Sequence, residues 1–96
     1  MAAYLIADLE ATGTDPAAIA DYRRDVPAIV AAFGGRYLAR GAAELLEGEK
    51  HPHHMAFLEF PDMAQLKAFY HAPEYRALVA VRQRGSRANI IAIEGL

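Results

Sequence analysis

The chain of 96 residues contains no cysteine, which excludes disulfides, thiolate-bound metals and cysteine nucleophiles. Basic residues are not in excess either, because ten Lys and Arg stand against twelve Asp and Glu. A nucleic-acid-binding domain usually carries a basic face, so nucleic acid is not expected as a partner. No apolar run is long enough to cross a membrane, and the segment MAAYLIADLEATG lacks the basic start of a signal peptide. We expect a cytoplasmic protein that makes no contact with a membrane.

The sequence also lacks the familiar catalytic motifs. It has no phosphate loop, dinucleotide fingerprint or paired-carboxylate motif, and its one serine, Ser86, has no nucleophile-elbow context. What is present is a hydrophobic fraction of 54%, which suits one globular domain spanning residues 1–96. A domain of this size buries only about 60–65% of its unfolded surface, so a partner subunit would add stability.

The first half of the chain reads as a strand, a helix and a second strand. The apolar segment 3–10 predicts a strand. Asp15 and Pro16 suit the first turn of a helix that ends at Gly34-Gly35, and Pro27 is expected to kink or divide it. A strand begins at Arg36, and Gly41 suggests a bulge or bend before residues 42–48. A short helix over 42–47 is the alternative for that last segment.

The second half repeats the order. Residues 48–52 read as a hairpin connection and 53–60 as a strand ended by Pro61. Asp62, with Gln65 three residues later, opens a helix, and Pro73 separates it from a second helical stretch that runs to about Arg84. Residues 88–95 form the last strand. The order βαββαβ predicts an α+β, ferredoxin-like fold, an antiparallel sheet with its helices on one face.

The strand at 53–60 carries large apolar groups on both faces. Ala56, Leu58 and Phe60 alternate with Met55 and Phe57. Two helices cover only one face of a sheet, and an uncovered apolar face marks an interface. The chain is therefore expected to form a homodimer with itself, sheet to sheet.

Several segments together resemble one bacterial family. They are GGRYLARG at 34–41, LEGE at 46–49, LEFPD at 58–62, FYHAPEYRAL at 69–78 and IIAIEG at 90–95. The family is the one catalogued as domain of unknown function thirteen-thirty, in the dimeric α/β-barrel superfamily. The resemblance covers nearly the whole chain and implies a ferredoxin-like protomer whose sheet faces that of a second copy. It implies no activity, although other families of the superfamily include cofactor-free monooxygenases.

Three histidines, His51, His53 and His54, lie just before the strand at 53–60. A zinc site needs three or four converging ligands, Pro52 strains chelation by His51 and His53, and His54 points to the other face. We interpret the segment as a polar, solvated hairpin and expect no metal.

Tyr75, Leu78, Val79 and Arg82 recur at helical spacing, so Arg82 lies on a largely apolar helix face. An arginine in such a place is rarely left unpaired. It either forms an ion pair, with Glu59 or Glu94, or a backbone-carbonyl contact, or its guanidinium lies in a cleft and holds a substrate carboxylate or enolate.

Arg36, Leu38 and Arg40 are expected to share one strand face. If that face looks toward the helices, Arg40 lines a pocket with Tyr75 and Arg82. If it looks toward the partner, Arg40 pairs with an acid across the dimer.

Two hypotheses follow. The first is a pocket between sheet and helices that binds a small anionic or carbonyl-bearing metabolite, with no cofactor and with the capacity for enzymatic chemistry. Arg40, Tyr70, Tyr75 and Arg82 are the candidate ligand-binding residues, and His71 and Tyr75 the candidate catalytic ones, since an unperturbed histidine titrates near neutral pH. The second hypothesis is a non-catalytic dimeric module whose arginines are structural.

Overall fold

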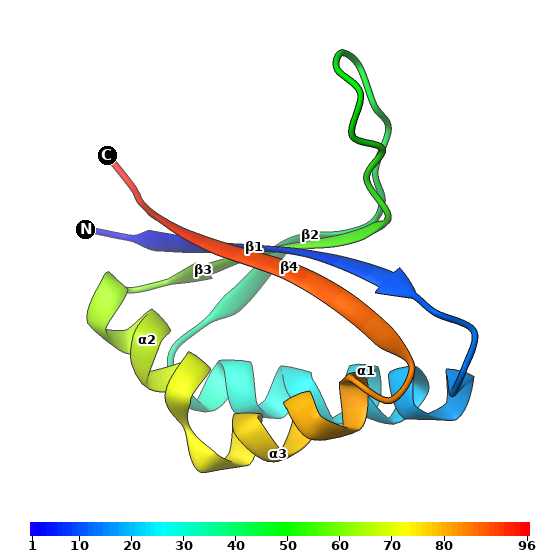
Figure 1. Cartoon of the computed structure of the whole chain (residues 1–96). Helices are drawn as coiled ribbons and strands as arrows, with labels where there is room; N and C mark the ends of the chain where they lie inside the picture. Colours follow the sequence, from blue (N-terminus) through cyan, green and yellow to red (C-terminus); the bar gives the residue numbers. More distant parts are fainter.

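The computed structural model describes all of residues 1–96 and has the ferredoxin-like fold. Four strands form one antiparallel sheet in the order β2-β3-β1-β4, and the helices cover one of its faces (Figure 1). None of the helices has both the length and the apolar character of a membrane span. The elements are β1 (Ala3–Ala11), α1 (Pro16–Ala32), β2 (Arg36–Ala42), β3 (His54–Phe60), α2 (Met63–His71), α3 (Pro73–Arg82) and β4 (Ser86–Glu94).

The helix ends follow the sequence signals. The Asp15 carboxylate accepts a hydrogen bond from the Ala18 amide at 3.1 Å, and the Asp62 carboxylate accepts one from the Gln65 amide at 2.8 Å. Gly34 ends α1 with a φ of 78°, the left-handed conformation that glycine adopts without steric cost. Both expected helix starts and the glycine stop are therefore confirmed.

Pro27 does not divide α1, which was one of the two effects expected of it. The helix runs unbroken from Pro16 to Ala32. Proline removes one backbone donor, but Val26 and Val30 on either side of it are buried in the core. Packing of this apolar face holds the helix together across the missing bond.

A bulge in β2 overturns the expectation that Arg36, Leu38 and Arg40 share a face. The pairing of β2 with β3 shifts between Tyr37 and Ala39, so the extra residue is Leu38, and the bulge does not lie at Gly41. Because side chains alternate along a strand, one inserted residue reverses the faces that follow it. Arg36 therefore lies on the face away from the helices, and Arg40 lies on the helix side.

The segment after β2 is neither the expected bent strand nor the alternative short helix. β2 ends at Ala42, and residues 43–53 form an irregular arm that rises from the side of the sheet opposite the helices (Figure 1). Leu46 in this arm is almost fully exposed. Leucine and glutamate have little reason to form a helix here, because most residues of the arm are exposed and a short helix without a buried apolar face is not stable. β4 also begins earlier than expected, at Ser86.

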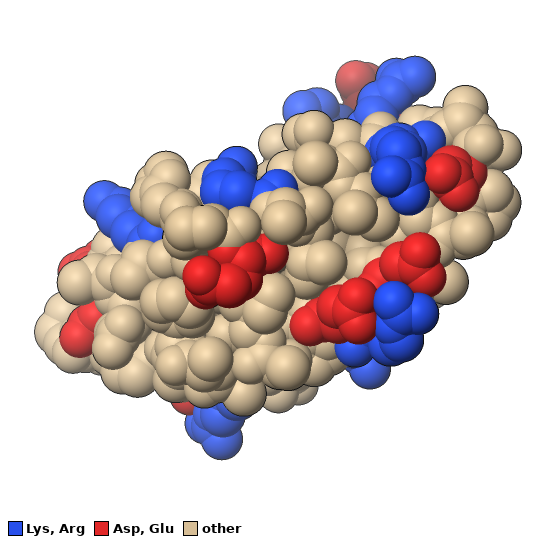
Figure 2. Space-filling view, turned by 90° about the horizontal axis from the view of Figure 1, so that it is seen from below, with Lys and Arg blue, Asp and Glu red and all other residues tan.

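The core lies between the sheet and the helices. Phe60, Phe69, Tyr75 and Val30 are its largest fully buried side chains. On the helix side of the molecule, positive and negative side chains are interspersed and form no patch of one sign (Figure 2).

The opposite sheet face has no cover. Tyr4 and Phe57 stack there with ring centroids 5.5 Å apart, while Ile91 and Ile93 of β4 are 52% and 54% exposed. The alternation expected for β3 is confirmed, because Leu58 and Phe60 are buried toward the helices.

Candidate functional site

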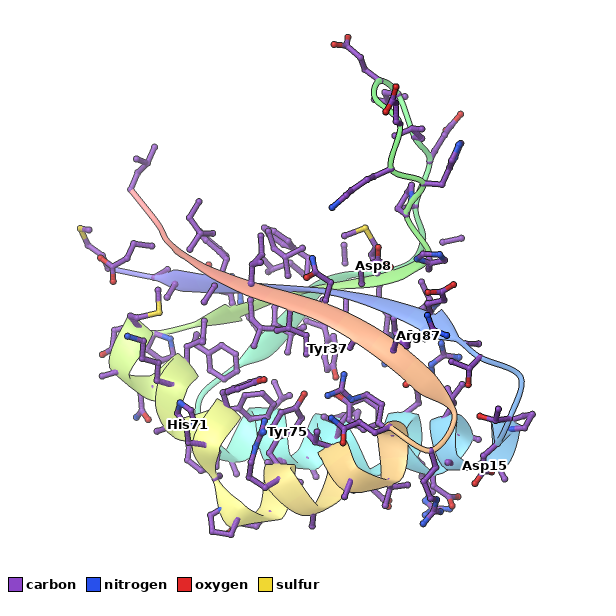
Figure 3. The ribbon with its side chains drawn as sticks, viewed as in Figure 1. Asp8, Asp15, Tyr37, His71, Tyr75 and Arg87 are labelled. Atoms are coloured by element: carbon purple, nitrogen blue, oxygen red, sulfur yellow. The ribbon has the colours of Figure 1, made fainter.

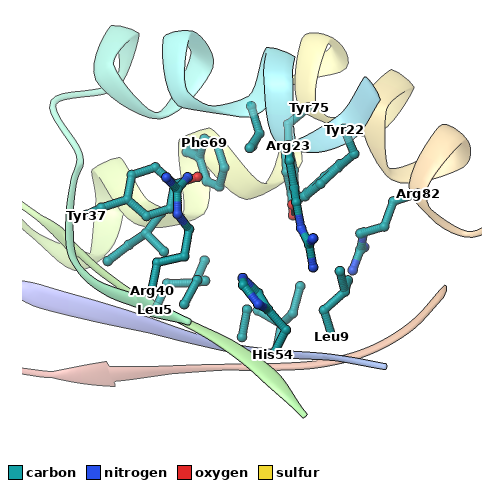
Figure 4. A pocket seen from close by; sticks show the side chains of 15 residues that line it. Leu5, Leu9, Tyr22, Arg23, Tyr37, Arg40, His54, Phe69, Tyr75 and Arg82 are labelled. Carbon is teal, nitrogen blue, oxygen red and sulfur yellow. Dashed lines mark hydrogen bonds between the residues drawn. The ribbon is translucent and has the colours of Figure 1, made fainter. Parts of the chain in front are cut away.

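A cavity lies between the sheet and the helices, and its polar side chains come from every layer that surrounds it. Arg23 belongs to α1, Arg40 to β2, His54 to β3 and Arg82 to α3. The four heads point into the same space (Figure 4). Residues nearly sixty positions apart in the sequence thus contribute cationic or titratable groups to one site.

Arg82 is the most unusual of these residues. Only 4% of it is exposed, and its Nε–H has no hydrogen-bond partner in the protein. The guanidinium lies over the ring of Tyr22, 5.3 Å from the centroid. This cation–π contact offsets part of the cost of burying the charge, but it satisfies none of the N–H donors.

Two tyrosine hydroxyls lie beside this arginine. The hydroxyls of Tyr22 and Tyr75 are 2.9 Å apart and share a hydrogen bond. One donates and the other accepts, so the accepting hydroxyl keeps its own proton free for a further partner. Burial raises the pKa of Tyr22 well above its usual value, and the neighbouring Tyr75 raises it further. Tyr22 therefore stays protonated at neutral pH, and the pair remains a hydrogen-bond donor.

Arg40 and His54 form the other polar part of the lining. Arg40 lies over the Tyr37 ring, 5.1 Å from the centroid, and Tyr37 projects from the sheet toward the helix layer that carries Tyr75 (Figure 3). Burial lowers the pKa of His54, and the charges of Arg23 and Arg40 lower it further. A lowered pKa favours neutral imidazole, which can accept a proton or a hydrogen bond.

The lining contains three arginines and no carboxylate. The protomer has four arginine–carboxylate ion pairs and two contacts of His53 with acids, and none involves Arg23, Arg40 or Arg82. Three unpaired guanidiniums around one space produce a positive potential that favours an anion. Their planar forks match the two oxygens of a carboxylate.

The rest of the lining is apolar. Eleven of the fifteen lining residues are hydrophobic, among them Leu5, Val26, Leu58, Phe69 and Ile90. The cavity has a volume of about 60 Å³, and one water molecule needs about 10–15 Å³. It therefore encloses a carboxylate and the carbon atoms next to it. The cavity is open to solvent beside the exposed Arg23 and Arg40, so a larger apolar body can extend outward there.

Arg40, Tyr75 and Arg82, which the sequence proposed as one group, do line this cavity together. Tyr70 and His71 do not line it: the Tyr70 ring lies 5.8 Å from that of Tyr75, centroid to centroid, and His71 is exposed at the end of α2. The ion pairs suggested for Arg82 are absent. Glu59 pairs instead with Arg36 on the other sheet face, at 2.8 Å.

Sequence reasoning missed four polar or aromatic lining residues, Tyr22, Arg23, Tyr37 and His54. The spacing of apolar residues in α1 shows that Tyr22 lies on the apolar face of that helix. Its hydrogen bond to Tyr75 joins residues 53 positions apart, which no local pattern predicts. The interpretation of His54 as part of a solvated hairpin is wrong, because His54 lies in β3 and lines the cavity. Side chains two residues apart on a strand lie on the same face, so His54 shares the helix side of β3 with Ala56 and Leu58. This spacing is the signal in the sequence that identifies His54 as a lining residue.

The other histidines lie elsewhere. His53 is near two acids of β1, with Nδ1 3.3 Å from Asp8 and Nε2 3.6 Å from Glu10, on the face away from the helices. His51 is exposed in the arm. No three side chains among His, Asp and Glu converge as metal ligands would.

The model of the family described as Domain of unknown function (DUF1330) matches residues 2–96. The chain belongs to this family. The resemblance seen in the sequence is thereby confirmed for almost the whole chain. No curated protein matches the sequence.

Solved structures with the same fold cover 99% of this DUF1330 protein. The RPA0582 protein of unknown function from Rhodopseudomonas palustris is 23% identical, with a TM-score of 0.76 and 82% of its own length covered. A dimeric ferredoxin-like protein of unknown function from Jannaschia sp. CCS1 is 17% identical, with a TM-score of 0.77 over all of its length. SnoaB, a cofactor-independent oxygenase from Streptomyces nogalater, is 13% identical, with a TM-score of 0.70 and 93% coverage.

Proposed function

We propose that this protein binds a small organic acid in the cavity between the sheet and the helices. The observation that carries the proposal is the buried, unpaired guanidinium of Arg82, beside two further arginines and without a carboxylate. Leaving a buried charged donor unsatisfied is costly, and an incoming carboxylate removes that cost. The ligand is a small metabolite with a carboxylate or carbonyl group and an apolar body.

Each polar group has a role in this proposal. Arg82 and Arg40 hold the negative charge, and the free proton of the Tyr22–Tyr75 pair donates to a second oxygen. Arg23 and Arg40 are exposed on the solvent side and attract the anion toward the cavity. The apolar walls select a hydrocarbon body over a sugar or a peptide.

The same geometry supports an enzymatic form of the proposal. Neutral His54 accepts a proton from a carbon next to the ligand's carbonyl, and the electron pair moves onto the carbonyl oxygen. Arg82 and the tyrosine pair stabilise the resulting oxyanion. SnoaB, which shares the fold, is described as a cofactor-independent oxygenase, so this architecture can perform chemistry without a cofactor.

Binding is tested by calorimetric titration with benzoate and with benzamide at low ionic strength. The proposal predicts saturable binding of benzoate and none of its neutral amide. Arg82→Met weakens benzoate binding at least about tenfold, while Arg24→Met, at an exposed ion pair with Asp25, leaves it unchanged. Equal responses to both compounds, or to both variants, would contradict an anion site.

We also propose that the protein is a homodimer formed through the face of the sheet away from the helices. Tyr4, Phe57, Ile91 and Ile93 leave this face apolar and uncovered, and exposed patches of this kind are typical of interfaces. Structural relatives from Jannaschia sp. CCS1 and Thermobifida fusca YX are described as dimeric ferredoxin-like proteins. The arm at residues 43–53 rises on the same side (Figure 1), where it would flank a second copy.

The second candidate function is a dimeric module without a ligand, in which the arginines only stabilise the fold. This second candidate predicts that Arg82→Ala lowers the melting temperature, and that neither the wild type nor the variant binds benzoate. Ligand binding predicts instead a folded dimer that no longer binds benzoate. Calorimetry and thermal melting on the same variant distinguish the two.

A further inference from the structure

The arm at residues 43–53 stands away from the sheet, on the face that the helices leave open (Figure 1). It is fastened at its base, where the His53 carbonyl accepts a hydrogen bond from the Ala43 amide at 3.5 Å and the Asp8 carboxylate accepts one from the His53 amide at 3.0 Å. Beyond this base, residues 44–52 form no hydrogen bond and no ion pair within the protomer. The polar groups of the arm are therefore available to a second molecule.

The limb of the arm that leads out from the sheet is largely apolar and ends in an exposed leucine. Leu46 is 91% exposed and lies just before the turn at Gly48, where φ is 110°. Burying a leucine side chain against another apolar surface is favourable, because it removes that side chain from water. Folding of the protomer does not provide this burial for Leu46, so contact with a partner is what would supply it.

An apolar hollow lies at the foot of the arm, on the same face of the sheet. Seven of its nine lining residues are hydrophobic, and its volume is about 390 Å³. The lining residues on this face are Ile6, Ala39, Gly41, Met55 and Phe57. The lining continues into the arm at Ala43, so the hollow and the arm form one concave corner. A second copy that covers the face of the sheet comes to lie in this corner.

Simple dimensions carry the tip of the arm past the sheet of such a second copy. Each limb has about five residues and spans up to about 17 Å when extended, whereas two sheets packed face to face lie only about 10 Å apart. Four strands of up to nine residues give a face of about 19 by 30 Å, or roughly 570 Å² in projection. A standard stable interface buries about 800 Å² on each partner. The arm therefore adds contact area to a face that is small for a stable dimer.

We propose that the arm of each protomer clasps a second copy of this chain and buries Leu46 against it. This inference rests on the proposed dimer and adds a second contact zone outside the sheet face. In a two-fold dimer the contact forms twice, once for each arm. The partner is a second copy because the arm and its hollow share the face on which Ile91 and Ile93 are exposed, and one molecule seated there covers all of them.

The first test is the dissociation constant of the dimer, measured by sedimentation equilibrium over a dilution series. Leu46→Asp should weaken dimerisation about hundredfold or more, because each dimer loses two buried leucines. The circular dichroism spectrum should not change, since Leu46 lies outside the core of the protomer. Ala17→Asp adds the same charge at an exposed position of α1 and should leave the dissociation constant unchanged.

The second test detects the contact between copies directly. The wild-type chain has no cysteine, so Glu47→Cys carries a nitroxide label at a single position in the arm. This labelled protein is mixed with isotope-labelled wild type, and the amide signals of the wild-type copy are recorded. The arm label should broaden signals along one edge of the wild-type sheet. The same label at Ala17→Cys, on the helix side, should broaden none of these signals.

Two results overturn the inference while the wild type remains a dimer. One is an unchanged dissociation constant in Leu46→Asp, and the other is an arm label that broadens no signal of the second copy. Either result leaves the sheet-to-sheet dimer standing and assigns the arm to a different partner, such as another protein or a lipid surface. A wild type that stays monomeric throughout the dilution series overturns both the clasp and the dimer.

Discussion

Replacing Arg82 by methionine separates a ligand-binding arginine from a structural one. Methionine keeps an unbranched apolar stem and removes the guanidinium, with its buried, unpaired Nε–H and its contact over Tyr22. An unsatisfied buried donor costs about 1–3 kcal/mol, whereas the cation–π contact stabilises by about 0.5–2 kcal/mol. These contributions nearly offset, so we expect the free energy of unfolding to change by less than about 2 kcal/mol in either direction.

A structural arginine gives a different result. If the guanidinium mainly stabilises the fold through its buried contact with Tyr22, its removal costs about 2 kcal/mol or more, which lowers the melting temperature of a domain this size by about 8 °C or more. The loss of a charged hydrogen bond to a bound carboxylate, about 1.5–3 kcal/mol, corresponds to about a 10- to 150-fold loss of affinity.

The assays are thermal and urea unfolding of the ligand-free protein, followed by calorimetric titration with benzoate. We expect Arg82→Met to unfold close to the wild-type temperature and to bind benzoate at least about tenfold more weakly. Arg24→Met is the control, because that side chain is exposed, and neither measurement should change. A large fall in melting temperature with unchanged benzoate affinity would refute the reasoning.

Four further predictions rest on other parts of the molecule. Gly35→Ala should lose about 1–3 kcal/mol in urea unfolding, because its Cβ would lie 2.6 Å from the Phe60 ring. The lowered pKa of His54 means that the unfolded chain binds protons more readily, so stability should fall as the pH drops below about 6.5, and less so in His54→Gln. The raised pKa of Tyr22 should make stability fall above about pH 10, a loss that Tyr22→Phe lacks. Ile91→Asp should convert a dimer to a monomer in sedimentation velocity, because it charges the uncovered sheet face.

Each of these has a clear contrary result. If Gly35→Ala is as stable as the wild type, the close contact of the new Cβ with Phe60 is relieved at no cost in free energy. If stability depends on pH in the same way in a variant and in the wild type, the replaced residue does not contribute to that pH dependence. A wild-type particle that already sediments as a monomer at micromolar concentration would end the case for a dimer through the sheet.

Local signals predicted most of the fold. The caps at Asp15 and Asp62 and the proline before α3 set the helix boundaries, and period-two alternation oriented β3 correctly. These features depend on residues within a few positions of one another, so one sequence is enough to find them. Local propensity alone could not decide whether Pro27 would divide α1, because the continuity of the helix depends on the packing of Val26 and Val30 in the core.

The bulge at Leu38 shows why the site was only half predictable. Nothing local marks an extra residue in β2, yet it moves Arg40 from the open face to the cavity and separates it from Arg36. Arg82 and Tyr75 were identifiable from helical spacing alone. Tyr22 and Arg23 join them only because α1 packs beside α3, a contact between distant parts of the chain.

The central claim is that the unpaired Arg82 guanidinium receives an organic anion, and NMR of the arginine Nε–H groups measures this directly. In the free protein, the Arg82 Nε–H should give a resolved signal that exchanges slowly with water, because the group is buried. Benzoate should move this signal saturably, while benzamide should not. An Arg82 signal that exchanges as fast as those of the exposed arginines, or that benzoate leaves in place, would contradict the account.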